Sequence, residues 1–103
     1  MFANTPTPPY YAVIFSSVRT SEDAGYSDLS DQLVELVQNQ EGFLGMESAR
    51  NEIGITVSYW KDLESIRMWK ENNLHKIAQQ NGKKLWYKSF KVRICKVERD
   101  YEF

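Results

Sequence analysis

The chain has 103 residues, of which 42% are hydrophobic and 26% charged, and these values fit one globular domain. Lys and Arg total 13 while Asp and Glu total 14, so the net charge is −1, which argues against a dedicated nucleic-acid-binding protein. One cysteine and one histidine exclude an intramolecular disulfide and a protein-only zinc site, and no apolar run is long enough to span a bilayer. We therefore expect a cytoplasmic protein with neither nucleic acid nor membrane as a partner.

The first third of the chain predicts an arm, a strand and a helix. Residues 1–9 are rich in Pro and Thr without periodicity, so we expect a flexible N-terminal arm. Residues 10–19, YYAVIFSSVR, are aromatic and β-branched, which is typical of a largely buried strand. A helix ending near residue 40 should follow the next turn, with Ser27 or Asp28 as its N-cap. Its apolar stripe consists of Leu29, Leu33, Leu36 and Val37.

A hairpin and a second helix are predicted next. Residues 43–49 alternate along the chain and residues 54–60 are β-branched and aromatic, so the two segments should pair antiparallel. Asp62 should cap the second helix, and the weak helix formers Asn72 and Asn73 either continue this helix or break it in two. Its stripe consists of Leu63, Ile66, Trp69, Asn73 and Ile77.

The last element is a strand from Trp86 onward, with alternating residues and one wetter face. The predicted order is β-α-β-β-α-β, so we expect residues 10–103 to form one ferredoxin-like α+β domain whose antiparallel sheet carries both helices on one face. The strands are apolar on both sides, yet the chain has no further element to cover the second side. A second copy would cover it, so we expect a homodimer that closes into an α+β barrel.

Two segments, GFLGMESAR at residues 42–50 and GITVSYWKDLESIRMWKEN at residues 54–72, resemble the antibiotic biosynthesis monooxygenase (ABM) family. The resemblance extends over residues 10–97. Its strongest marks are the loop Glu41-Gly42-Phe43, the strand end Tyr59-Trp60 and the helix residue Trp69. The resemblance implies a dimeric α+β barrel, in agreement with the order of the predicted elements.

Members of this family share a fold but differ in chemistry, so an activity is implied only by matched residues. One branch oxidises phenolic polyketides with molecular oxygen and without metal or flavin. That branch has a strand Trp, an Asn shortly before it and a Tyr on the next helix. Trp60 matches the first, whereas Thr56 and Ile66 occupy the other two places.

Another branch of the family cleaves haem. It has an Asn on the first strand, a Trp on the second helix and a His further along that helix. Trp69 matches the Trp, while Ser16 or Ser17 and Gln79 stand at the other places. His75 lies about one turn before the family's His. Neither catalytic set is therefore present as a whole.

Two polar residues of the second helix are candidate catalytic residues. His75 is the side chain expected to titrate near neutral pH, so it is a candidate base or haem ligand, or else a residue of the solvated helix face. Asn73 falls within the apolar stripe, where a buried amide must bond either protein groups or a ligand carbonyl or phenol. The alternative role for Asn73 is a cap or helix break.

The candidate substrate-binding residues are mostly aromatic. Aromatic rings can enclose a planar ligand, although the same rings serve equally well as ordinary core. Ser17 joins them because its hydroxyl interrupts an apolar strand, either facing a cleft or lying at a strand end. The predicted set comprises Ser17, Tyr59, Trp60, Trp69 and Trp86, with Tyr87 as a further wall.

These features predict a cofactor-independent monooxygenase of a small aromatic or enolisable substrate. The rings would form the walls, and Asn73, Ser17 or His75 would bond or deprotonate the substrate. The sequence has no phosphate loop and no dinucleotide fingerprint, so we expect no cofactor. The alternatives are a non-catalytic small-molecule-binding or stress-related dimer of the same fold, and a haem-binding or haem-degrading protein that uses His75.

Overall fold

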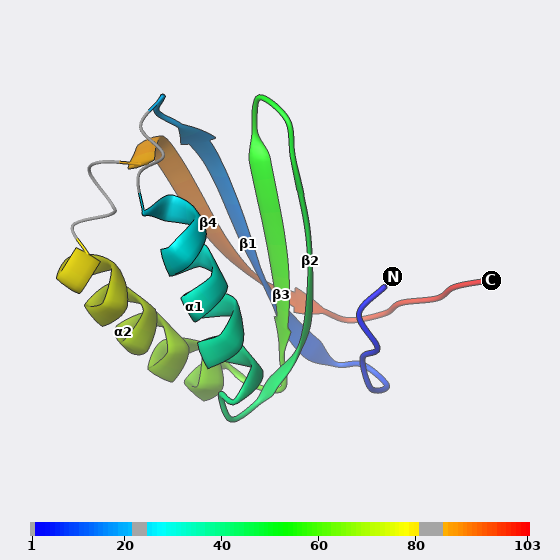
Figure 1. Ribbon diagram of the computed structural model, residues 1–103. Coiled ribbons are helices and arrows are strands. Elements are labelled where there is room, and N and C mark those ends of the chain that lie inside the picture. The colour runs from blue at the N-terminus through cyan, green and yellow to red at the C-terminus, as the bar shows by residue number, and fades with distance from the viewer. Residues whose placement is uncertain (1, 22–24, 81–85) are drawn as a thin grey trace.

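The computed structural model describes residues 2–21, 25–80 and 86–103, with the side chains of residues 29 and 74–80 left out (Figure 1). Its elements are β1 (Tyr10–Arg19), α1 (Tyr26–Gln38), β2 (Phe43–Arg50), β3 (Gly54–Trp60), α2 (Leu63–Gln80) and β4 (Tyr87–Val97). In these residues the four strands form one antiparallel sheet of order β2-β3-β1-β4. The predicted ferredoxin-like α+β fold is confirmed.

Both helices lie on the same side of the sheet (Figure 1). Because side chains alternate along a strand, the register divides the sheet into a helix-facing side and a far side. Residues of each row share a side across the four strands. The helix-facing rows, from the top of Figure 1 downward, are Arg50-Gly54-Ser17-Phe90, Ser48-Thr56-Phe15-Val92, Met46-Ser58-Val13-Ile94 and Phe43-Trp60-Tyr11-Lys96.

The core lies at the lower end of the helix-facing side. Trp60 is fully buried and joins Val37 of α1 to Ile66 of α2. The Trp60 ring stacks on Trp69 with centroids 6.1 Å apart, and Phe43 meets it edge-on at 5.4 Å. The burial of these large rings makes this end the main source of hydrophobic stabilisation.

The helix starts agree with the prediction at α2 and differ from it at α1. Asp62 caps α2, because its Oδ1 accepts the Ser65 N–H at 2.8 Å, and the bonds from Ser65 lower the pKa of this carboxyl. The predicted cap of α1 at Ser27 or Asp28 is wrong. Helix α1 begins at Tyr26, after Gly25 with φ 79°, and has no side-chain cap bond.

Helix α2 runs from Leu63 to Gln80 without a break at Asn72 or Asn73. Its packed face begins at Ile66, because Leu63 is exposed. Asn72 and Asn73 stay helical because the packing of the rest of α2 outweighs their lower helix propensity, a difference of about 0.5 kcal/mol per residue. No helix of the described residues combines the length and hydropathy needed to cross a membrane.

The far side of the sheet is partly covered by the two ends of the chain. The Ala3 N–H donates to Glu47 Oε2 at 2.8 Å, and the Tyr10 hydroxyl donates to Asp100. Tyr59 also lies on this side, where its hydroxyl donates to Glu47 Oε1 at 2.7 Å. Burial, followed by the bond to Glu47, raises the pKa of Tyr59 to about 12. The arm thus contacts the sheet, and its flexibility stays a prediction.

Candidate functional site

The helices cover only part of the helix-facing side. Trp60 is fully buried at the lower end, but the three apolar side chains that β4 contributes to the same side are exposed to solvent. Phe90 is 39% exposed, Val92 47% and Ile94 51%. An apolar surface this exposed is unfavourable in water. A planar ligand bound on the helix-facing side would cover it.

Polar side chains of β3 lie on the same side of the sheet, separated from β4 by β1. Thr56 and Ser58 are half-buried and share the helix-facing side with Phe15 and Val13. The Trp60 Nε1 donates to Ser58 Oγ at 2.9 Å, so that hydroxyl also holds the core ring in place. A ligand here would meet an apolar floor with hydroxyls along one edge.

Asn73 contributes a buried acceptor from α2. It lies one turn after Trp69, and its Oδ1 is buried with no hydrogen-bond partner in the described part of the chain. The adjacent Asn72 is satisfied differently, because its Nδ2 donates to Gln40 Oε1 at 3.3 Å. A buried carbonyl oxygen without a donor is destabilising, and a ligand hydroxyl would relieve that cost.

A second aromatic cluster lies at the upper end of the same side. Phe15 stacks on Phe90 and meets Tyr87 edge-on, both at 5.5 Å between centroids. Tyr26 of α1 meets Trp86 and Tyr87 edge-on at 5.7 Å and 6.1 Å. The cluster therefore joins the start of α1 to the start of β4.

The hydroxyls and cations of this upper end lie close together. The Tyr87 hydroxyl donates to the Tyr26 hydroxyl at 3.4 Å, and the Arg19 guanidinium lies 3.5 Å from the centre of the Tyr26 ring. Burial and the bond to Tyr26 raise the pKa of Tyr87, while the positive charges of Arg50 and Arg19 oppose this rise. Both arginines are thus near enough to act on this hydroxyl.

The structure separates the predicted aromatic residues into three places. Trp60 and Trp69 stack in the core, Trp86 belongs to the upper cluster with Tyr87, and Tyr59 lies on the far side. The five rings therefore do not enclose one site, and Trp60 and Trp69 take the alternative role of ordinary core. Adjacent strand residues point to opposite sides, so the strand prediction itself already separates Tyr59 from Trp60.

The polar candidates have different outcomes. Ser17 is 2% exposed on the helix-facing side, and its Oγ accepts a hydrogen bond from Arg50 Nη2. Asn73 lies on the same face of α2 as Trp69, and its Oδ1 is buried, as described above. The side chain of His75 falls outside the described residues, so its role stays a prediction. In the part of the chain that is described, no three His, Cys, Asp or Glu side chains gather as metal ligands.

Sequence reasoning missed Arg50 and the hydroxyls of β3. The hydroxyl pair had a signal, because Thr56 and Ser58 are two residues apart in an apolar strand and must share a side. No pattern in the sequence indicated a role for Arg50, because its neighbour Ser17 lies 33 residues away and only the strand register brings the two together.

Comparisons with known proteins agree with this fold. Residues 9–81 match the family model described as antibiotic biosynthesis monooxygenase. The uncharacterised protein YqjZ of Bacillus subtilis is 46% identical over 103 residues, which cover 98% of this chain and 90% of YqjZ.

Solved structures with the same fold are more distant in sequence. SnoaB, a cofactor-independent oxygenase from Streptomyces nogalater, superposes with a TM-score of 0.71 at 10% identity, covering 90% of this chain and 97% of SnoaB. PA3566 from Pseudomonas aeruginosa gives a TM-score of 0.68 at 14% identity, covering 93% and 99%. At such identities these two structures support the fold alone.

Proposed function

The chain belongs to the antibiotic biosynthesis monooxygenase family, and on this premise we propose that it is a cofactor-independent monooxygenase of a small aromatic or enolisable substrate. The substrate ring lies on the open helix-facing surface formed by Phe90, Val92 and Ile94. Asn73 Oδ1 accepts a hydrogen bond from its phenol or enol hydroxyl.

The observation that carries the proposal is the buried Oδ1 of Asn73, which has no hydrogen-bond partner among the described residues and belongs to the helix that covers the same side of the sheet as the exposed β4 side chains. An acceptor at this place polarises the substrate O–H and raises the electron density of the ring or enol, which is what reduction of oxygen requires. The substrate supplies all the electrons. A C–O bond forms at an activated CH2 carbon, the O–O bond breaks, the carbon becomes a carbonyl and the second oxygen atom leaves as water.

We expect Asn73→Ala to lower kcat/KM for oxygen uptake at least about tenfold, because the substrate loses its acceptor at the reacting end. Oxygen consumption by the purified protein would be measured on a panel of anthrones and phenols that carry an activated CH2 group. Asn72→Ala is the matched control, since it removes the same amide from the neighbouring position and should leave the rate unchanged. A wild-type protein inactive on the whole panel, or an unimpaired Asn73→Ala variant, would contradict the proposal.

A non-catalytic binding protein is the second candidate function, and one observation favours it. The helix position at which the oxygen-using branch has a Tyr holds Ile66, which is buried in the core and offers no polar group. In that case aromatic ligands quench tryptophan fluorescence through the rings beside the surface, and no oxygen is consumed. The Asn73→Ala variant would then weaken binding rather than turnover.

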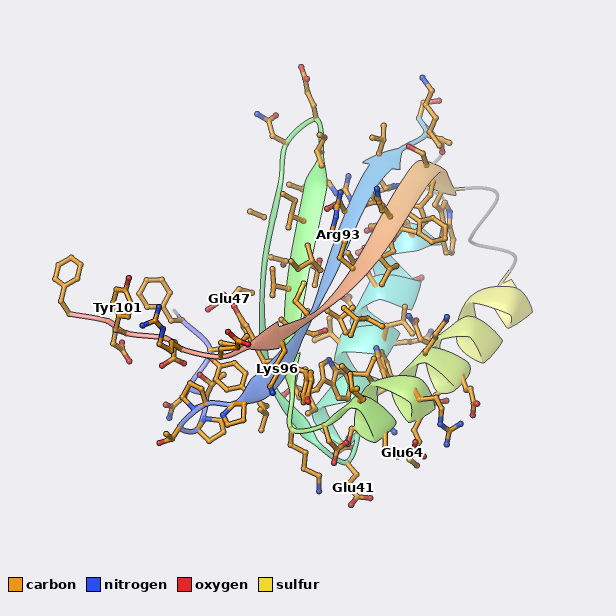
Figure 2. All side chains as sticks on the ribbon, turned by 180° about the vertical axis from the view of Figure 1, so that it is seen from behind. Glu41, Glu47, Glu64, Arg93, Lys96 and Tyr101 are labelled. Atoms are coloured by element: carbon orange, nitrogen blue, oxygen red, sulfur yellow. The ribbon has the colours of Figure 1, made fainter. Side chains whose placement is uncertain are left out.

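We also propose that the protein acts as a homodimer through the far side of its sheet. Ile14 and Val57 are half-buried there and Ile55 is 45% exposed, so an apolar centre remains without cover from the described residues. Figure 2 views this side, with Glu47 and Arg93 labelled in the row Glu47-Val57-Ile14-Arg93. A two-fold axis parallel to the strands would place the Glu47 edge of one copy against the Arg93 edge of the other.

We expect Ile55→Glu to convert the dimer into a monomer at micromolar concentration, because it buries an unpaired charge in each half of a symmetric interface. Sedimentation velocity would measure the change. Ile94→Glu is the control, since Ile94 is similarly exposed but lies on the helix-facing side. A wild-type monomer, or a dimer that survives the Ile55 change, would count against the pairing.

A further inference from the structure

Arg50 occupies the upper end of the helix-facing side in an unusual way. It shares a row with Gly54 and Ser17, and a Cβ on Gly54 would lie only 2.1 Å from the Arg50 Cζ. The missing side chain therefore lets the guanidinium lie flat across β3 and reach β1. There Nη2 donates to Ser17 Oγ and Nη1 donates to the Ser17 carbonyl oxygen at 3.4 Å.

This anchoring holds a positive charge at the inner side of the sheet. In the described residues no carboxylate lies within ion-pair distance of Arg50, and the ion pairs found there are formed by Lys61 and Arg67. A guanidinium has five N–H donors, and the contacts with Ser17 use only part of them. Arg50 thus combines a fixed orientation with unused donors.

The next residue of the row beyond Ser17 is Phe90, which belongs to the upper aromatic cluster. Phe90 stacks on Phe15, and Tyr87 meets both rings edge-on. The positive charge of Arg50 also acts to lower the pKa of Tyr87, a member of this cluster. An aromatic floor therefore ends at a fixed cation.

We propose that Arg50 binds a carboxylate carried by the aromatic substrate, whose ring rests against Phe90 and Phe15. The planar fork of a guanidinium matches a carboxylate through two parallel hydrogen bonds, which selects an acidic substrate over its neutral analogue. Ser17 acts as a positioning residue, since it orients Arg50 and does not itself touch the ligand. This inference rests on the proposed function, because it specifies the substrate class of the same surface.

The test compares gentisate with gentisyl alcohol, two hydroquinones that differ only in a carboxylate against a hydroxymethyl group. Binding to the full-length protein would be measured by calorimetry under argon, so that no turnover is involved. We expect wild type to bind gentisate at least about tenfold more tightly, as charge-assisted pairs provide. Arg50→Gln should abolish this preference, Arg50→Lys should keep part of it, and Ser17→Ala should reduce it.

Lys96→Gln is the matched control. Lys96 carries the same charge on the same side of the sheet but lies six residues along β4 from Phe90, about 20 Å away. This variant should retain the full preference. Circular dichroism would check that each variant is folded, and the wild-type comparison does not depend on any variant.

Three outcomes would overturn the inference: equal affinity of wild type for both probes, no binding of gentisate at millimolar concentration, or a preference that survives in folded Arg50→Gln. Oxygen uptake on the substrate panel of the proposed function, measured separately in air, tests that function independently of the Arg50 site. A carboxylate preference that depends on Arg50 without any oxygen uptake supports the anion site and contradicts the monooxygenase.

Discussion

Replacing Trp60 by Ala should lower the free energy of unfolding by about 3–5 kcal/mol, the range found for large aromatic residues removed from a core. Trp60 is fully buried and packs with three elements, because it stacks on Trp69 of α2, meets Phe43 of β2 edge-on and clusters with Val37 of α1. Ala would leave a cavity between the sheet and both helices. It would also remove the hydrogen bond that Trp60 Nε1 donates to Ser58 Oγ. The loss is a large part of the stability of a domain this small.

Urea denaturation followed by far-UV circular dichroism would measure this loss. Trp60→Phe keeps an aromatic ring and loses only volume and the Nε1 hydrogen bond, so it should cost less, about 1–2 kcal/mol. Ile53→Ala, in the exposed hairpin, should change stability by less than about 0.5 kcal/mol. Equal losses for Trp60→Ala and Ile53→Ala would show that the core does not centre on this ring.

Gly42→Ala should be the second most destabilising change, at about 2–4 kcal/mol. Gly42 has φ 83°, a left-handed conformation that costs a residue with a Cβ about 1–2 kcal/mol. A Cβ there would also lie 2.0 Å from Ser65 Oγ and 2.5 Å from Ser65 Cβ, so the start of α2 would have to move. The Gly42 carbonyl oxygen meanwhile accepts the Lys61 N–H at 2.9 Å, which opposes such a movement.

A double-mutant cycle separates the two causes. Ser65→Gly removes the colliding atoms, so the coupling between Gly42→Ala and Ser65→Gly should reach about 1 kcal/mol or more. Gly25→Ala is the control for the backbone alone, since Gly25 has φ 79° but its Cβ would meet Trp86 only at an ordinary 3.4 Å. Denaturation midpoints that are the same for Gly42→Ala and Gly25→Ala would contradict the steric part of the argument.

Fold stability and ligand binding thus depend on different ends of the helix-facing side of the sheet. The lower end carries Trp60 and is closed by both helices, whereas the β4 side chains Val92 and Ile94 further up stay open. Changes in the core should therefore lower stability at every substrate concentration. Changes of Asn73 or Arg50 should alter affinity or turnover with smaller effects on unfolding.

The local pattern of the chain was sufficient for the order of elements and for the cap of α2. Runs of β-branched and aromatic residues predicted β1 and β3, alternation along the chain predicted β2 and β4, and Asp62 three residues before Ser65 supplied the cap. The start of α1 was misjudged because Ser27 and Asp28 are good caps by composition, while Gly25 takes that place through its left-handed backbone. The candidate site was predicted less well, since Asn73 and Ser17 were identified without their surroundings.

By itself, the sequence determined the α+β class and the ABM family, because hydrophobic periodicity and local motifs are written in neighbouring residues. Only the tertiary structure decided which rings meet. It placed Tyr59 with Glu47 on the far side, brought Arg50 across Gly54 to Ser17, and left Asn73 Oδ1 buried with no donor among the described residues. These contacts join residues distant along the chain, and they depend on strand register and on how far the helices extend over the sheet. Neither quantity is encoded in any single segment.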